Sequence, residues 1–114
     1  MKGLEVCANS YSSASAAEKG GAIRVELCEN MSEGGTTPSY ATIKLSKSKL
    51  NIEVWPIIRP RGGDFLYSAD EFELMKMDIE ICKDLGCDGI VFGILLADGQ
   101  IDKERCKILL DLAG

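Results

Sequence analysis

Apolar and polar residues alternate along two short segments near the beginning of the chain, and this alternation predicts two β-strands. The segments are "LEVCA", residues 4–8, and "IRVELC", residues 23–28. Successive side chains of a strand point to opposite faces, so each segment has one apolar and one polar face. We expect the apolar faces to pack against helices. These faces are formed by Leu4, Val6 and Ala8 in the first strand and by Ile23, Val25 and Leu27 in the second.

Two later segments are also typical of strands, and helical patterns separate the four. The later strands are "IEVWPIIR", about residues 52–59, and "DGIVFG", residues 88–93. Pro56 removes a hydrogen-bond donor from the first of them, which argues against regular pairing of that strand. Ser68 and Glu71 form the S-x-x-E pattern of a helix capping box. Helices are expected over residues 10–19 and 39–48, from Ser68 to Gly86, and from about Asp102 onward.

The order of these elements predicts an α/β fold. A strand–helix unit repeated four times gives a parallel sheet with right-handed crossovers. Two architectures fit: an open doubly wound sheet, and part of a (β/α)8 TIM-type barrel, whose eight units need about 200–250 residues. The charged second face of the first two strands favours the barrel, because an open parallel sheet is covered by helices on both faces. We therefore expect a single domain over residues 1–114, with the architecture of a half-barrel.

Composition narrows the function. The formal net charge of −5 argues against nucleic acid as a partner, because binding to phosphates needs a basic surface. No apolar run approaches the ~18 residues of a membrane span, and the start of the chain does not resemble a signal peptide. We expect a cytoplasmic protein without a membrane partner. There is no histidine, which excludes a Ser-His-Asp triad and His-ligated metal sites within this chain.

The five cysteines include no C-x-x-C pair, so we expect free thiols in a reducing compartment. The frame E-x-C-x-N occurs twice, and its second copy begins 21 residues after the first. It places Cys7 and Cys28 at the ends of neighbouring strands, where equivalent residues lie about 4.8 Å apart. Two thiolates at that spacing suit Cu(I), and the alternative is a pair of inert thiols that line the barrel. The remaining cysteines are expected to be packing residues: Cys82, Cys87 and Cys106.

Charged residues share the polar face of the predicted sheet with these thiols. Glu5 and Glu26 are candidate catalytic carboxylates, available for acid/base chemistry or metal ligation. Arg24 and Arg59 are expected to project toward the same interior. The structural alternative is a network in which two acids and two bases neutralise one another, and both interpretations can hold together.

The segment "RPRGGDF" after the third strand is a candidate anion-binding loop. It contains Arg59, Arg61, Gly62, Gly63 and Asp64. Glycines let backbone N–H groups curl around an anion, and arginine offers paired donors to a carboxylate or phosphate. The alternative is a rigid turn in which Asp64 pairs with Arg61 or caps backbone groups.

Several long segments of the chain resemble the CutC family, named for copper homeostasis. They are "LEVCANS", "GGAIRVELCENMSEGGTTPS", "IIRPRGGDFLYS" and "DGIVFG", and the similarity extends from residue 3 to the end. The resemblance implies a (β/α)8 barrel and copper binding by cysteines, which here would be Cys7 and Cys28. Three features depart from the family pattern. The family continues for four more βα units, Met31 stands where a leucine is more usual, and Pro56 stands where the family generally has an ordinary apolar residue.

Two functions follow from these features, and a truncated product with no activity is a third possibility. The first is a cytosolic CutC-like protein that takes part in copper homeostasis and binds copper(I) through cysteine thiolates at the barrel mouth. The second is a TIM-barrel enzyme that acts on a small anionic metabolite. A half-barrel leaves strand edges unpaired, so we also expect either self-association into a homo-oligomer or a longer protein that supplies the missing C-terminal half.

Overall fold

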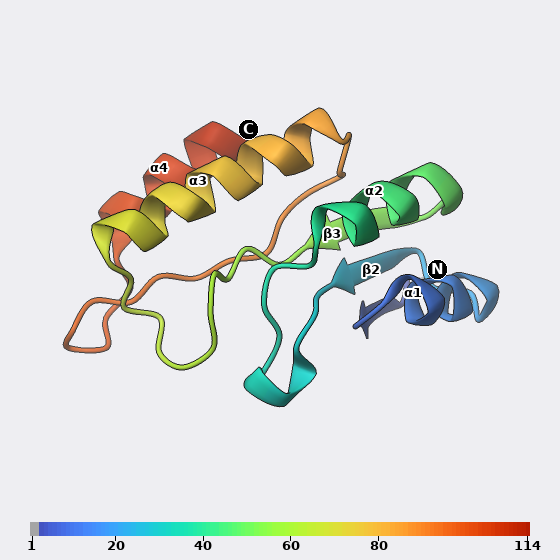
Figure 1. The fold of residues 1–114 in the computed structure, drawn as a ribbon, viewed down its shortest axis with the longest axis horizontal. Coiled ribbons are helices and arrows are strands. Elements are labelled where there is room, and N and C mark those ends of the chain that lie inside the picture. Colours follow the sequence, from blue (N-terminus) through green and yellow to red (C-terminus); the bar gives the residue numbers. More distant parts are fainter. Residues whose placement is uncertain (1–2) are drawn as a thin grey trace.

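The computed structural model describes residues 3–114, and strands alternate with helices as far as α3, which is followed by a further helix (Figure 1). They are β1 (Glu5–Ala8), α1 (Tyr11–Lys19), β2 (Arg24–Leu27), the 3-10 helix η1 (Met31–Glu33), α2 (Tyr40–Lys49), β3 (Glu53–Pro56), α3 (Ala69–Asp84) and α4 (Lys103–Ala113). The strands form one parallel sheet in the order β1-β2-β3. This arrangement confirms the α/β class. Helices α1 and α2 lie beside the strands, while α3 and α4 pack against each other (Figure 1).

The α-helices begin where the sequence places capping side chains. Ser10 accepts a hydrogen bond at the start of α1, and Ser39 does so at the start of α2. Ser68 and Glu71 form the predicted capping box at α3, with both reciprocal bonds present. Asp102 caps α4. None of the helices in the described part of the chain is both long and apolar enough to cross a membrane.

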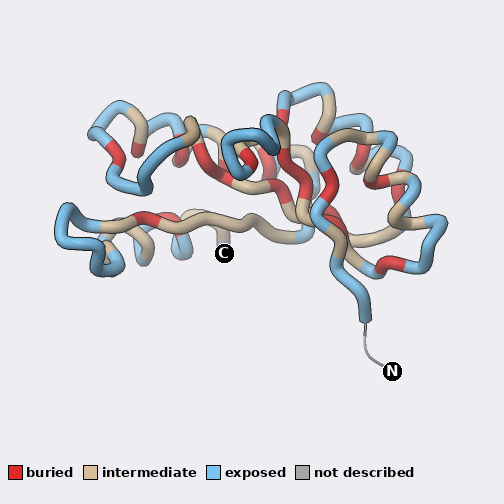
Figure 2. The backbone as a smooth tube through the Cα atoms, turned by 90° about the horizontal axis from the view of Figure 1, so that it is seen from below, coloured by how far each residue is buried: buried red, intermediate tan, exposed pale blue. Residues whose placement is uncertain are grey.

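The apolar faces of the central strands form the core, as predicted. Val25 and Leu27 of β2 and Val54 of β3 are fully buried, and they share one cluster with Ala14 of α1 and Ile43 of α2. Figure 2 shows buried residues along the strands and the inner sides of the helices, whereas the loop tips are exposed. The opposite face of the sheet carries half-exposed and exposed polar side chains.

The predicted burial is wrong for the first residue of each apolar face. Leu4 is 56% exposed and Ile23 is 50% exposed. Each precedes the first residue of its strand, so both lie beyond the region where strands and helices pack. Val6 is only half-buried: among the described residues no segment pairs with the outer edge of β1, whereas Val91 forms a bridge just beyond β3.

The predicted fourth strand, residues 88–93, is not a regular strand. It forms a single parallel bridge, between Ile57 and Val91. Val91 N donates to Pro56 O at 3.0 Å, and in a regular parallel ladder Pro56 N would donate in return to Gly89 O. Proline has no N–H, so this bond is absent. Pro56 therefore leaves the pairing of β3 with β2 intact and interrupts the pairing on the other side.

Candidate functional site

Three sulfur atoms meet at the C-terminal ends of β1 and β2. Cys7 lies in β1, and Cys28 directly follows β2. Their Sγ atoms are 3.7 Å apart. Met31 opens η1, and its Sδ lies 3.2 Å from Cys28 Sγ. We call these residues the sulfur triad; the sequence singled out the two thiols as a pair, but it gave the thioether no role.

The register of the strands differs from the one that the repeated frame suggested. Equivalent residues of the two copies are 21 apart, yet Glu5 pairs with Arg24 and Cys7 pairs with Glu26, each 19 residues on. The register is thus displaced by two residues, and it places an acid opposite a base at the start of the strands. The thiols still converge, because Cys28 lies beyond the last paired residue, where the chain turns into η1.

The backbone around the triad is tightly curved. Asn30 and Gly34 flank η1, and both adopt left-handed conformations, with φ of 58° and 86°. Gly35 follows with φ of 96°. A Cβ on Gly35 would lie 3.5 Å from Cys28 Sγ and 3.9 Å from Met31 Sδ. Glycine at this position therefore satisfies the backbone and also leaves space beside the sulfurs.

The surroundings of the triad are electrically negative. Burial, the hydrogen bond that the Cys28 thiol makes to Cys7, and electrostatic repulsion from Cys7, Glu26 and Glu29 raise the pKa of Cys28 to about 12. Burial and the neighbouring charge of Glu5 raise the pKa of Glu26 as well. Negative potential that resists thiol ionisation also favours a bound cation, which would displace the thiol proton.

The two candidate catalytic carboxylates have different partners. Glu5 accepts from Arg24 at 3.3 Å, and Arg24 also pairs with Glu53 at 3.1 Å. The Arg24 guanidinium lies 4.1 Å from the centre of the Trp55 ring. Glu26 makes no ion pair or side-chain hydrogen bond with the described residues. The structural network therefore accounts for Glu5, and an acid/base role for either carboxylate stays a prediction.

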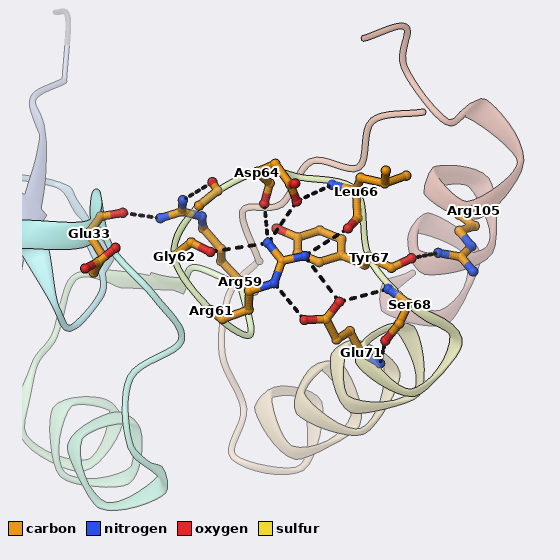
Figure 3. Close-up of polar contacts among 11 residues, drawn as sticks. Glu33, Arg59, Arg61, Gly62, Asp64, Leu66, Tyr67, Ser68, Glu71 and Arg105 are labelled. Carbon is orange, nitrogen blue, oxygen red and sulfur yellow. Dashed lines mark hydrogen bonds and ion pairs between the residues drawn. The ribbon is translucent and has the colours of Figure 1, made fainter. Parts of the chain in front are cut away.

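Arg59 does not join the polar face of the sheet, so that expectation is wrong. The residue is 7% exposed and lies between the loops that follow β2 and β3. Its Nη1 donates to Glu33 O (Figure 3) and, at 2.8 Å, to Gly35 O, while its Nη2 donates to Gly63 O at 2.8 Å. Phe65 packs against the guanidinium with its ring centre 4.9 Å away. The guanidinium therefore satisfies three backbone carbonyls of these loops and does not face the sheet.

Arg61 is held by its own loop and by α3. Its Nε donates to Glu71 at 2.7 Å, and Nη atoms donate to Asp64 O and Leu66 O (Figure 3). Asp64 Oδ1 lies 3.1 Å from Arg61 Nη1 and also accepts from Leu66 N. The Tyr67 ring lies under the guanidinium, 4.9 Å from its carbon. Arg61 lowers the pKa of Glu71, chiefly through this hydrogen bond.

These contacts match the structural alternative for the glycine-rich segment. The predicted anion site comprises Arg59, Arg61, Gly62, Gly63 and Asp64. In this conformation both guanidinium groups are bonded to oxygens of the chain, so an anion would have to replace one of those partners. Anion binding, and the enzyme function linked to it, stay predictions.

The other cysteines pack in the core, as predicted. Cys82 is buried, and Cys87 and Cys106 pack against the same cluster. Among residues 3–114, no group of three or more cysteine, aspartate or glutamate side chains is arranged to hold a metal ion. The sulfur triad contains two cysteines and one methionine, so it is not a group of this kind.

Comparisons with known proteins agree with the resemblance. The model of the CutC family matches residues 2–114. A CutC family protein of Chromobacterium violaceum is 57% identical over 111 residues, which are 97% of this chain and 45% of the relative. The Homo sapiens protein named copper homeostasis protein cutC homolog is 55% identical over 107 residues, 94% of this chain and 39% of the relative.

A solved structure is also similar. The crystal structure of a copper homeostasis protein CutC from Streptococcus agalactiae superimposes with a TM-score of 0.92 at 40% sequence identity. The match covers 99% of this chain and 55% of that chain. The chain therefore spans less than half the length of these two curated relatives and about half the length of the solved one.

Proposed function

The chain belongs to the CutC family, and from that premise we propose that it takes part in copper homeostasis by binding Cu(I) through the thiolates of Cys7 and Cys28. The observation that carries the proposal is the 3.7 Å separation of the two Sγ atoms. Thiolates are soft ligands and bind Cu(I) well. Copper is the cargo here, and no reaction is assigned to it.

The environment of the two thiols supports binding of a cation. Cys28 is buried, while Cys7 is exposed to solvent and gives an ion a route to both sulfurs. Glu26 and Glu29 add negative charge around the pair. A single positive ion compensates that charge, whereas an anion would be repelled.

Anaerobic titration with Cu(I) tests the proposal. We expect the chain to bind one Cu(I), and we expect Cys7→Ser and Cys28→Ser to lose most of that affinity. Cys106→Ser is the matched control, because Cys106 is a half-buried thiol on α4 outside the triad. Competition with a chromogenic Cu(I) chelator measures each affinity. Equal Cu(I) affinity in the unchanged chain and in all three variants would contradict the proposal.

We also propose that the four βα units form one side of a (β/α)8 barrel in a cytoplasmic protein. The parallel order of β1, β2 and β3, the polar second face of the sheet and the unpaired outer edge of β1 support this arrangement. The remaining wall would come from a second copy or from further chain. Light scattering tests the first source: a dimer mass is expected, and a monomer at every concentration would exclude it.

A further inference from the structure

The Met31 thioether is the part of the triad that the proposed function leaves unused. Its side chain is 47% exposed, as expected of a residue in a surface loop. Its sulfur nevertheless turns inward and lies 3.2 Å from Cys28 Sγ. We infer that Met31 is the third ligand of the copper site, so that Cu(I) is held by two thiolates and one thioether. This inference rests on the proposed function and assigns a residue beyond it.

The spacing of the sulfurs favours three ligands over two. With a metal–sulfur bond of about 2.3 Å, two thiolates on opposite sides of a metal would be about 4.6 Å apart. Three sulfurs around one metal would be about 4.0 Å apart at the same bond length. The two separations from Cys28 Sγ are 3.7 Å to Cys7 Sγ and 3.2 Å to Met31 Sδ. They are closer to the three-coordinate value, and small side-chain movements would reach it.

The turn that carries Met31 is held firmly in place. Gly34 N donates to Met31 O at 2.9 Å and closes η1. The Arg59 guanidinium donates to the carbonyls of Glu33 and Gly35, on either side of Gly34. A ligand on a turn fixed in this way loses less entropy when it binds a metal.

A thioether also suits the charge of the site. Two thiolates and one Cu(I) carry a net charge of −1, and Glu26 and Glu29 already make the surroundings negative. A third thiolate or carboxylate would increase that charge, whereas a thioether adds a soft donor without charge. Zn²⁺ takes thiolate, imidazole and carboxylate ligands. Met31 is therefore expected to set the preference of the site for Cu(I) over Zn²⁺.

The experiment compares the chain with Met31→Leu, and Met77→Leu serves as the matched control, because Met77 is 58% exposed on α3. Under anaerobic conditions, we expect Met31→Leu to weaken Cu(I) binding about tenfold, which corresponds to about 1.4 kcal/mol. Copper-edge X-ray absorption should count three sulfur neighbours in the chain and two in Met31→Leu. Zn²⁺ affinity should change much less, and Met77→Leu should match the chain in every measurement.

A second measurement does not depend on the folding of the variant. In the chain labelled with selenomethionine, the copper edge should show one selenium neighbour, and this neighbour should be absent from labelled Met31→Leu. A labelled chain without a selenium neighbour overturns the inference. If Cys7→Ser and Cys28→Ser still lose Cu(I) in that case, the proposed function survives. If they bind Cu(I) like the chain itself, the proposed function fails as well.

Discussion

Two glycine-rich loops follow strand ends in this chain, and they use their polar side chains in opposite ways. The sulfur loop, residues 28–36, keeps its sulfurs near one another with few other partners. The arginine loop, residues 59–67, directs its guanidinium groups to carbonyl and carboxylate oxygens of the same chain. In the sequence both loops are typical of ligand sites. In the structure, the guanidinium groups of the arginine loop are already hydrogen-bonded within the chain, whereas the sulfurs of the sulfur loop have few partners.

The two loops are also coupled through one side chain. Arg59 starts in the arginine loop and binds carbonyls on both sides of Gly34 in the sulfur loop. Its guanidinium therefore fixes the turn next to the sulfur triad. The arginine loop thus acts as a support for the sulfur loop, in addition to any ligand of its own.

Replacing Arg59 should break this arrangement most severely. In Arg59→Met, the carbonyls of Glu33, Gly35 and Gly63 lose their charged donor, which we expect to cost on the order of 3 kcal/mol of unfolding free energy. Urea denaturation measures this loss. Cu(I) affinity should fall about 10- to 100-fold, because support of a metal ligand is lost.

Arg61→Met is the matched control for that change. Arg61 is one-third exposed and bonds only to its own loop and to Glu71. It should lose less stability than Arg59→Met and keep the Cu(I) affinity of the chain. If both variants weaken copper binding equally, the arginine loop supports the sulfur loop as a whole and not through Arg59.

Replacing one glycine of each loop with alanine tests whether the two loops differ in their effect on copper binding. Gly35 and Gly63 have φ of 96° and 85°, so Gly35→Ala and Gly63→Ala should each lose about 1–3 kcal/mol of unfolding free energy from backbone strain. Their surroundings differ. A Cβ on Gly35 would contact Cys28 Sγ, whereas a Cβ on Gly63 would be no closer than 3.9 Å to Arg61.

Copper binding should therefore separate the two alanine variants. We expect Gly35→Ala to bind Cu(I) about tenfold more weakly, as when the outer shell of a metal site is changed. Gly63→Ala should bind like the unchanged chain. Similar affinities for both variants would mean that the space beside Cys28 is not used by the metal.

Much of the fold could be predicted from local patterns. Capping residues such as Ser68 and the apolar alternation around Val25 act over a few residues, so the sequence shows them directly. The irregular segment 88–93 depends on Pro56, some 30 residues earlier in the chain. The sequence indicated that Pro56 lacks a hydrogen-bond donor. It did not indicate that the missing bond would be the one to residues 88–93 and not the one to β2.

The site was predictable to a similar degree. The repeated frame identified Cys7 and Cys28, whose sulfurs do meet. It misplaced the strand register by two residues, since a repeat in the sequence does not fix the stagger between strands. Met31 was missed because its approach to Cys28 depends on η1, a turn set by left-handed backbone at Asn30.

The smallest expected effect concerns the ion pair that holds the arginine loop to α3. The hydrogen bond from Arg61 holds the pKa of Glu71 below its ordinary value of 4.5, so the carboxylate stabilises the fold at pH values above that value. This contribution is lost as the pH falls through the lowered pKa of the folded state. Glu71→Gln should therefore lower the urea midpoint at pH 7, and this effect should shrink steadily as the pH falls below 4.5. Asp70→Asn is the control, because it removes a charge from the same first turn without touching Arg61. A pH-independent loss in Glu71→Gln would show that the side chain acts through packing, and the arginine loop would then be held by its backbone contacts alone.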